Sequence, residues 1–360
     1  MLNFTVGPVQ MSDEICELGK NQVPYFRTSE FSEVMKENEK LFLDLLNAPE
    51  RSRAVFITGS GTSSMEAVVM GVLSSDDRAI VIDGGSFGHR FNQLCDLHGI
   101  PHDAVCLAPG ESLTDSHLRQ FSDKKPTAVL VNLCETSTGV LYDLGLLSSF
   151  CREKGALLIV DAVSAFLADD IDMTKYGVDV VITGSQKALA LPPGISLIAC
   201  SPRAINRIES IQPKCMYLDL QSALKNGERG QTPFTPAVGI LLQLNARLHQ
   251  IEDAGGYAVE HARIADQARD FRSRIADFPF DMLPTHPSNA VTALKARGFS
   301  AKRLFETLKD EYGIWICPNG GDLAESVFRI GHIGALSAND NEALVQALES
   351  LRDRGFFEER

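Results

Sequence analysis

Short runs of apolar residues alternate with amphipathic stretches over the first two-thirds of the chain. The runs are apolar almost throughout, rather than at every second position, which is typical of strands covered on both faces. The predicted strands are residues 54–58, 79–82, 128–131, 157–160, 178–182 and 195–199, and the helical stretches between them include 62–73, 87–98 and 144–154. This alternation predicts an α/β fold, with a mostly parallel sheet that helices cover on both faces.

The pattern changes after about Pro236. Two long helical stretches, 237–253 and 259–278, meet at Gly255-Gly256. Shorter candidate strands follow at 290–294, 314–317 and 327–330, near helical stretches at 301–310 and 339–352. We therefore expect an N-terminal segment (1–20) that packs on the small domain, a large domain (21–240) and a smaller α+β C-terminal domain (241–360).

Composition and charge narrow the class of protein. The 360 residues are 44% hydrophobic and 22% charged, which is ordinary for a globular chain with one large core and a smaller second one. The net charge of -13 and the pI near 5.1 disfavour a nucleic-acid or anionic-membrane partner, because such partners require a basic face. No leader pattern or run of about 18 apolar residues is present, so we expect a cytoplasmic protein.

The eight cysteines are scattered along the chain, without a C-x-x-C spacing. In a chain of this size the pattern predicts buried, reduced thiols, and neither a disulfide framework nor a metal site.

One lysine stands out by its position. Lys187 follows an apolar strand and the small residues Gly184 and Ser185, and it precedes a Pro192-Pro193-Gly194 turn. A lysine in such a place can be desolvated, which favours the neutral amine that forms Schiff bases. Most lysines are solvated surface charges, however, so this position alone does not decide between the two interpretations.

The stretch from Thr58 to Thr62, Thr-Gly-Ser-Gly-Thr, joins a predicted strand to a predicted helix. Glycines allow close approach of the backbone, and a helix N-terminus offers free N–H groups to a phosphate. A capped tight turn is an equally good interpretation. The stretch is not a nucleotide-binding loop of the Walker type, because no Lys-Ser/Thr pair follows, and it lacks the G-x-G-x-x-G spacing.

Three further strand ends carry unusual residues. Asp161 directly follows the apolar run 157–160, and it either caps the next helix or pairs with a protonated ring nitrogen. Phe87 lies between small residues, so it either stacks on a flat ring or belongs to the core. Thr136 lies in a hydroxyl-rich turn. In an open α/β sheet these ends share one edge, and together with Lys187 they match the needs of pyridoxal phosphate.

With these residues the sequence resembles the class V aminotransferases of fold type I, most closely the alanine–glyoxylate, serine–pyruvate and 2-aminoethylphosphonate–pyruvate group. The resemblance covers nearly the whole chain, from Thr5-Val6-Gly7-Pro8 to Phe328-Arg329-Ile330-Gly331. Its most specific part is the lysine motif Gly184-Ser185-Gln186-Lys187-Ala188-Leu189.

The resemblance implies pyridoxal 5'-phosphate as cofactor and assigns roles around it. Lys187 would bind the cofactor as a Schiff base and shuttle the proton during catalysis. Asp161 would pair with the pyridinium nitrogen, and Phe87 and Val163 would pack on the two ring faces. The remaining cofactor contacts would come from Ser60, Gly61, Thr62 and Gln186 at the phosphate and from Thr136 at the 3'-oxygen.

The resemblance also implies a homodimer with shared active sites. Thr232 and Thr235 would reach the phosphate of the neighbouring subunit, although Thr232 replaces an aromatic hydroxyl found in some relatives. Arg329 would clamp the substrate carboxylate, with Gly7 and Arg27 as further substrate contacts. Arg27 follows a phenylalanine where many relatives have histidine, and a surface ion pair is the alternative role for it.

The expected activity is ping-pong transfer of an amino group from a small donor of the alanine, serine or 2-aminoethylphosphonate type to pyruvate or glyoxylate. One alternative is a 2-aminoethylphosphonate–pyruvate transaminase specifically. Another is a lyase or desulfurase of the same class, for which Cys317 would be the candidate thiol. A non-catalytic binding protein is disfavoured, because a bare scaffold has no need of a lysine, an aspartate and an arginine so placed.

Overall fold

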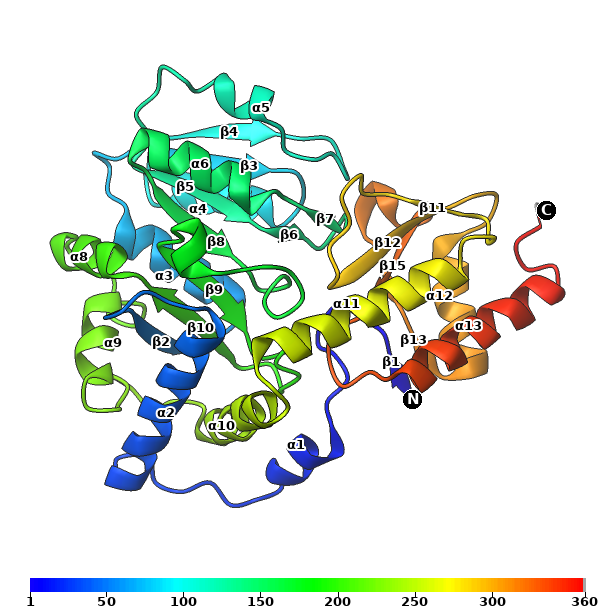
Figure 1. Cartoon of the computed structure of the whole chain (residues 1–360), viewed down its shortest axis with the longest axis horizontal. Coiled ribbons are helices and arrows are strands. Elements are labelled where there is room, and N and C mark those ends of the chain that lie inside the picture. The colour runs from blue at the N-terminus through cyan, green and yellow to red at the C-terminus, as the bar shows by residue number, and fades with distance from the viewer. Residues whose placement is uncertain (359–360) are drawn as a thin grey trace.

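The structure is a computed structural model that describes residues 1–358. It contains two units, each built around its own sheet, which lie side by side (Figure 1). The large unit contains α2 (Ser29–Leu45), β2 (Arg53–Thr58), α3 (Gly61–Val72), β3 (Ala79–Asp83), α4 (Gly88–Leu97), β4 (His102–Cys106), α5 (Asp115–Arg119), β5 (Ala128–Asn132), β6 (Cys134–Glu135), β7 (Val140–Leu141), α6 (Leu144–Lys154), β8 (Leu157–Asp161), α7 (Met173–Tyr176), β9 (Val180–Gly184), β10 (Ile195–Cys200), α8 (Pro202–Ser210), α9 (Leu220–Gly227) and α10 (Val238–Asp253).

The small unit follows, and the N-terminal segment contributes to it. Its elements are β1 (Leu2–Asn3), α11 (Tyr257–Arg274), β11 (Phe280–Met282), β12 (Val291–Ala296), α12 (Ala301–Tyr312), β13 (Ile314–Trp315), β14 (Cys317–Pro318), the 3-10 turn η1 (Gly321–Leu323), β15 (Val327–Gly331) and α13 (Ala338–Asp353). A short helix, α1 (Asp13–Leu18), connects β1 to the large unit and packs on α10.

The large sheet has seven strands in the order β2-β10-β9-β8-β5-β3-β4. Only β10 runs against its neighbours; every other adjacent pair is parallel. The predicted α/β fold with a mostly parallel sheet is therefore confirmed. The carboxyl ends of β2, β3, β5, β8 and β9 share one edge, and the start of β10 lies beside the ends of β2 and β9.

The central strands are apolar throughout because both of their faces are buried. Along β3, Ala79 and Val81 belong to the core on one face of the sheet, and Ile80 and Ile82 belong to the core on the other. Helices α3 and α4 contact one face and α6 the other, as Figure 1 shows. A strand covered in this way has no solvent side, so no polar alternation remains in its sequence.

Some elements escaped the sequence pattern. The edge strand β4 was not predicted, because it is only partly buried and contains His102 and Asp103. The predicted strand 314–317 is two short strands, of which β13 pairs with β1 and β14 with β15. Not all thiols are buried as predicted: the eight cysteines are free, but Cys16 and Cys106 are exposed.

The small sheet is antiparallel, in the order β11-β12-β15-β14. The N-terminal segment joins this unit, since Leu2 pairs with Ile314 and the Gly331 N–H donates to the Phe4 carbonyl. Helix α10, by contrast, buries its apolar side chains in a core of the large unit. We propose that the junction between the units lies at Gly255-Gly256, whose positive φ angles of 113° and 76° allow the turn from α10 into α11.

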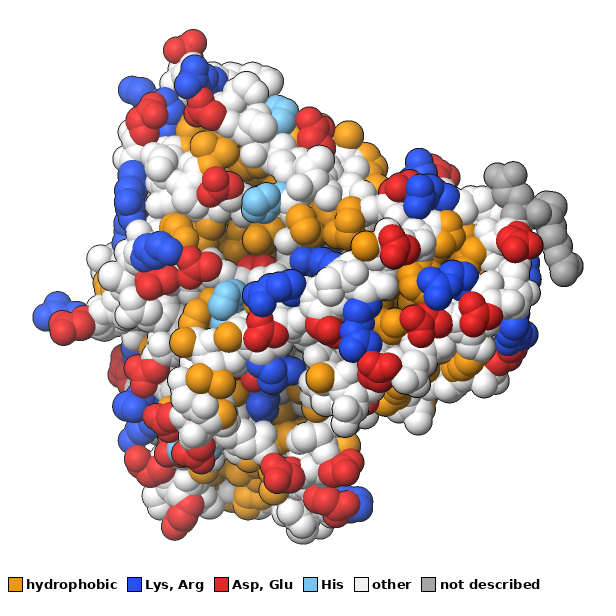
Figure 2. Space-filling model, turned by 45° about the vertical axis from the view of Figure 1, so that its right-hand side comes forward, with side chains coloured by type: hydrophobic (Ala, Val, Ile, Leu, Met, Phe, Trp, Pro, Cys, Tyr) orange, Lys and Arg blue, Asp and Glu red, His pale blue; other side chains and the backbone are white. Residues whose placement is uncertain are grey.

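Figure 2 shows acidic and basic side chains interspersed over one face of the molecule. Within residues 1–358, no helix is long and apolar enough to cross a membrane.

The burial of β8 predicts a large cost for truncating one of its side chains. Leu158→Ala removes a fully buried side chain and leaves a cavity, so the free energy of unfolding should fall by about 2–5 kcal/mol. Urea denaturation of the apoprotein measures this change. The matched control is Leu97→Ala, which truncates a leucine that is 71% exposed and should change stability by less than about 0.5 kcal/mol. Equal effects of the two substitutions would contradict the assigned core.

Candidate active site

Lys187 lies in the loop after β9, at the carboxyl edge of the sheet. Its side chain is buried, and its Nζ donates a hydrogen bond to the backbone carbonyl of Val6 in the N-terminal segment. Burial lowers the pKa of the Lys187 amine to about 8, from an ordinary value of 10.5, because a desolvated ammonium is costly. Gly7 leaves room for this side chain, since a Cβ there would lie 2.7 Å from Lys187 Cδ and Cε.

Asp161 is the last residue of β8. This strand lies next to β9, the strand that the lysine loop follows. Its carboxylate accepts hydrogen bonds from the Val163 N–H and from Asn132 Nδ2, each at 2.9 Å. Burial raises the pKa of the Asp161 carboxyl to about 6. No helix begins directly after Asp161, so the helix-cap interpretation does not apply. A buried carboxylate with two neutral donors is left to pair with a cationic group in the cavity.

The turn before α3 is open to a ligand. Ser60 occupies the N-cap position, yet its side chain makes no capping hydrogen bond. Gly61 begins the helix, and a Cβ there would lie 2.7 Å from Val163 Cγ2, so only glycine allows this close approach. The first-turn N–H groups of a helix have no intrahelical acceptors. The capped-turn interpretation is therefore not what the structure shows, and the geometry suits an anion.

Phe87 is held at the cavity by a residue that the sequence analysis did not assign. The Glu135 side chain is fully buried and accepts hydrogen bonds from the backbone N–H groups of Phe87 and Gly88, at 3.1 and 2.9 Å. It also accepts from the N–H and hydroxyl of Ser137. Glu135 thus joins the Phe87 turn to the hydroxyl-rich turn. The signal in the sequence was only a weak one, an acid at the start of the hydroxyl-rich turn and a few residues after the end of β5.

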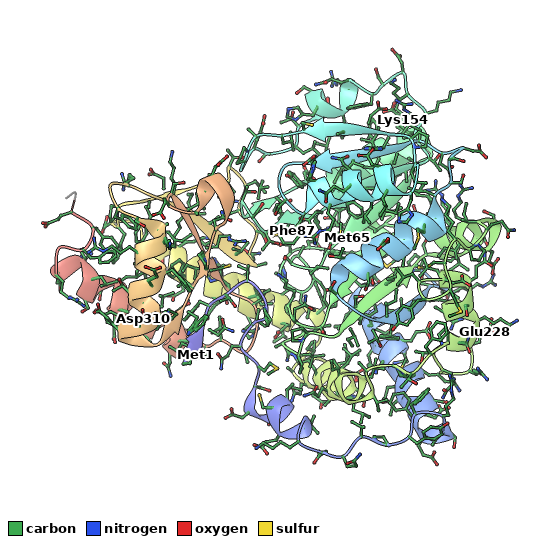
Figure 3. All side chains as sticks on the ribbon, turned by 180° about the vertical axis from the view of Figure 1, so that it is seen from behind. Met1, Met65, Phe87, Lys154, Glu228 and Asp310 are labelled. Carbon is green, nitrogen blue, oxygen red and sulfur yellow. The ribbon has the colours of Figure 1, made fainter. Side chains whose placement is uncertain are left out.

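These residues meet in one cavity of about 350 Å³. Phe87 and Met65 lie close together at the side of the large unit that faces the small unit (Figure 3). Of the residues proposed from the sequence, the cavity is lined by Gly7, Ser60, Gly61, Thr62, Phe87, Thr136, Asp161, Val163, Gln186 and Lys187. Lining residues that the sequence analysis missed are Pro8, Met65, Arg90, Asn132, Ser164 and Pro193.

Arg329 reaches the same region from β15 of the small unit. Its Nη1 donates to the Thr136 carbonyl at 3.0 Å and its Nη2 to the Pro318 carbonyl at 2.8 Å. Its Nε is buried without a hydrogen-bond partner. The guanidinium is therefore fixed by backbone carbonyls, which do not neutralise its charge.

Residues 20–330 match the family model described as Aminotransferase class-V. The chain belongs to the class V aminotransferase family. A Synechococcus sp. protein named soluble hydrogenase, small subunit, is 31% identical over 96% of this chain and 91% of its own. The L-aspartate–glyoxylate aminotransferase of Paracoccus denitrificans is 29% identical over 80% and 75%. A crystal structure of an aspartate aminotransferase of subgroup IV from Thermus thermophilus has a TM-score of 0.91 and 26% identity, with 98% and 99% of the two chains covered.

Class V aminotransferases depend on pyridoxal phosphate, and the cavity of this class V chain fits that cofactor. The buried amine of Lys187 suits attachment to an aldehyde, and Asp161 suits a protonated ring nitrogen. The glycine at position 61 and the uncapped turn around it suit the phosphate. The predicted cofactor is therefore matched by groups of the right chemistry at both ends of one cavity.

Four of the proposed site residues are not among those that line this cavity. Arg329 lies beside it, bound to the carbonyl of the lining residue Thr136, and the other three lie elsewhere. Thr232 and Thr235 line a separate surface groove, together with Tyr217 and Phe234. Arg27 is exposed and donates to the carbonyls of Thr232 and Pro233, at 3.1 and 3.2 Å. It makes no ion pair within residues 1–358, and neither role predicted for it is tested.

The lowered pKa of Lys187 predicts how the apoenzyme takes up its cofactor. The folded protein loses the lysine proton as the pH rises through about 8, whereas an ordinary lysine keeps it until about 10.5. Since only the neutral amine attacks an aldehyde, the rate of pyridoxal phosphate uptake should rise about tenfold per pH unit below 8 and level off above it. Stopped-flow absorbance measures the rate. A rate that continues to climb to pH 10 would contradict the desolvated lysine.

Proposed function

We propose that this class V aminotransferase moves the amino group of a small donor to a small 2-oxo acid, pyruvate or glyoxylate, in two half-reactions. The observation that carries the proposal is the convergence of Lys187 and Asp161 in one cavity, with Arg329 beside it. These three groups supply an amine with a lowered pKa, a buried carboxylate and a cation without an acidic partner within residues 1–358. The name of the Paracoccus denitrificans relative, an aspartate–glyoxylate aminotransferase, supports glyoxylate as an acceptor.

Lys187 would act twice in each half-reaction. Its buried amine would hold the cofactor in the resting enzyme. When free, the amine would take the proton from the substrate Cα and pass it to the cofactor carbon that the lysine had held. Pyridoxal phosphate, when bound, withdraws electrons from that carbon and accepts the nitrogen. The pKa of about 8 leaves an appreciable neutral fraction of the Lys187 amine near physiological pH, which general-base catalysis requires.

Asp161 would hold the proton on the ring nitrogen. Its pKa of about 6 keeps the Asp161 carboxyl mostly ionised at pH 7 to 8, so it can face a cationic ring nitrogen. The Asn132 amide and the Val163 N–H prevent the carboxylate from rotating away. Their hydrogen bonds leave the orientation of Asp161 independent of the cofactor.

Arg329 would bind the carboxylate of the donor and of the 2-oxo acid. The planar guanidinium fork suits a carboxylate, which it contacts through two parallel hydrogen bonds. Because Arg329 lies on the small unit and donates to the Thr136 carbonyl of the large unit, a bound carboxylate would join the two units.

A homodimer would explain the residues outside the cavity. The groove that contains Thr232 and Thr235 adjoins exposed apolar side chains, including Tyr217, which is 51% exposed and stacked on Phe234. We place the subunit interface there, so that these threonines serve the cavity of the partner. Arg27 would act at the same boundary, since it binds the carbonyls of residues 232 and 233.

The desulfurase alternative depends on a mobile thiol. Cys317 lies on β14, paired in register with Arg329, and its Sγ contacts the Pro318 carbonyl at 3.6 Å. A thiol in a paired strand lacks the freedom to travel to a substrate, so this observation favours transamination.

An amino-donor screen tests the proposed function. The holoenzyme should convert at least one of L-alanine, L-serine, L-aspartate and 2-aminoethylphosphonate with pyruvate or glyoxylate as acceptor, followed by the visible absorbance of the bound cofactor. Lys187→Ala should lose the borohydride-reducible linkage and at least about 10²-fold in rate. Sulfide release from cysteine would instead favour the desulfurase, and no turnover with any donor would favour a binding protein.

Substitution of Arg329 tests the carboxylate contact. Arg329→Gln should raise the KM for the 2-oxo acid about 10- to 100-fold, because charge-assisted hydrogen bonds are lost. Arg329→Lys keeps the charge but loses the fork, so an intermediate KM is expected. The matched control is Arg297→Gln, an arginine whose side chain is 56% exposed on the same unit. An unchanged KM in Arg329→Gln would rule out the contact.

A further inference from the structure

The phosphate end of the cavity needs more positive charge than the Ser60–Thr62 turn and Gln186 supply. A phosphate monoester carries a charge of about −1.5 to −2 at pH 7. Ser60, Gly61, Thr62 and Gln186 offer only neutral donors, and a helix N-terminus contributes about half a unit of positive charge. The cavity should therefore contain another cation near this end.

Arg90 is such a cation. It lines the same cavity as Lys187 and the Ser60–Thr62 turn. Among residues 1–358, Arg90 and Lys187 are the only arginine and lysine in that lining. Arg90 belongs to α4, three residues after Phe87. Lys187 is committed to the aldehyde end and is neutral when it reacts, so Arg90 is left as the lasting positive charge.

Neighbouring side chains fix Arg90 but do not neutralise it. Its Nη1 donates to Thr62 Oγ1 at 2.9 Å, and its guanidinium lies 5.0 Å from the centroid of the Phe87 ring. No carboxylate within residues 1–358 forms an ion pair with it. The acid on the neighbouring strand, Asp83, is bound to His89 and Asn92.

The contact with Thr62 also orients a hydroxyl. Arg90 has only donors, so Thr62 Oγ1 must act as the acceptor in this bond. The hydroxyl hydrogen of Thr62 is then free to point to another acceptor. An oxygen that accepts from a cation is a stronger donor in turn, so the pair presents a charge and a polarised hydroxyl together.

We propose that Arg90 is a cofactor-binding residue that supplies positive charge to the cofactor phosphate and fixes Thr62 as a phosphate donor. This inference rests on the proposed function, since it needs pyridoxal phosphate in the cavity. It adds a cationic partner to a phosphate site whose other members in this subunit are neutral.

Comparison of two ligands isolates the phosphate. Pyridoxal has the ring and aldehyde of the cofactor but no phosphate. In the apoenzyme, Arg90→Gln should weaken pyridoxal phosphate binding about 10- to 100-fold and leave pyridoxal binding unchanged. Equilibrium titration followed by absorbance gives both dissociation constants, and inorganic phosphate should compete with pyridoxal phosphate in the wild type more strongly than in the variant.

Two further variants serve as controls. Arg119→Gln makes the same change of net charge at an arginine whose side chain is 77% exposed, and it should leave both ligands unaffected. Thr62→Val should weaken binding of pyridoxal phosphate alone. Combined with Arg90→Gln it should cost less than the sum of the single losses, because the two side chains act through one hydrogen bond.

The outcomes separate this inference from the proposed function. A wild-type protein that binds neither ligand would refute the proposed function. The role of Arg90 at the phosphate is overturned in two cases, provided that the wild type binds pyridoxal phosphate. In the first, Arg90→Gln binds pyridoxal phosphate as tightly as the wild type does. In the second, Arg90→Gln weakens the binding of pyridoxal as much as that of pyridoxal phosphate. If the variant fails to fold, phosphorus NMR of the wild-type holoenzyme tests the role instead. The bound phosphate should stay dianionic below the second pKa of a free phosphate monoester, which is about 6. A bound phosphate that takes up a proton near pH 6 would overturn the role.

Discussion

The burial of one amine constrains much of this structure. Lys187 is buried at the cavity wall, and its Nζ donates to the Val6 carbonyl of a segment 181 residues away in the sequence. That contact requires the N-terminal segment to cross the sheet edge, and Gly7 must be a glycine for the lysine to fit. The same segment pairs with β13 and β15 of the small unit. Desolvation of the amine, which lowers its pKa, is therefore a property of both units and not of the lysine loop alone.

The topology explains why so many functional groups meet at one edge. Parallel strands β3, β5, β8 and β9 place their carboxyl ends together, and antiparallel β10 returns its starting turn to the same edge. The Gly59 N–H donates to the Gly194 carbonyl at 2.9 Å, so the phosphate turn and the lysine loop are joined directly. A ligand at this edge contacts several segments at once without any of them being long or flexible.

Charged side chains around the cavity have different tasks. Asp161 lines the cavity as an acid, and Arg90 lines it as a cation near the Ser60–Thr62 turn, where it donates to Thr62. Glu135 is also buried, but its oxygens are occupied by N–H and hydroxyl donors that fix the Phe87 turn. Arg329 approaches the cavity from the small unit and donates to the Thr136 carbonyl. Because neighbouring protein groups hold each of these side chains, the cavity keeps its arrangement without depending on a ligand.

The sequence alone determined the sheet, the lysine loop and most of the cavity lining. Continuous apolar runs require strands covered on both faces, and Lys187, Asp161 and Ser60–Thr62 follow such runs directly. Local signals of this kind say nothing about groups on helices or edge strands, so β4, Arg90 and the part played by Glu135 were missed. Only the tertiary structure showed that Arg329 has no acidic partner within residues 1–358 and that Thr232 and Thr235 lie outside the cavity. Burial, pairing and distance depend on contacts between residues far apart in the chain, which no local pattern specifies.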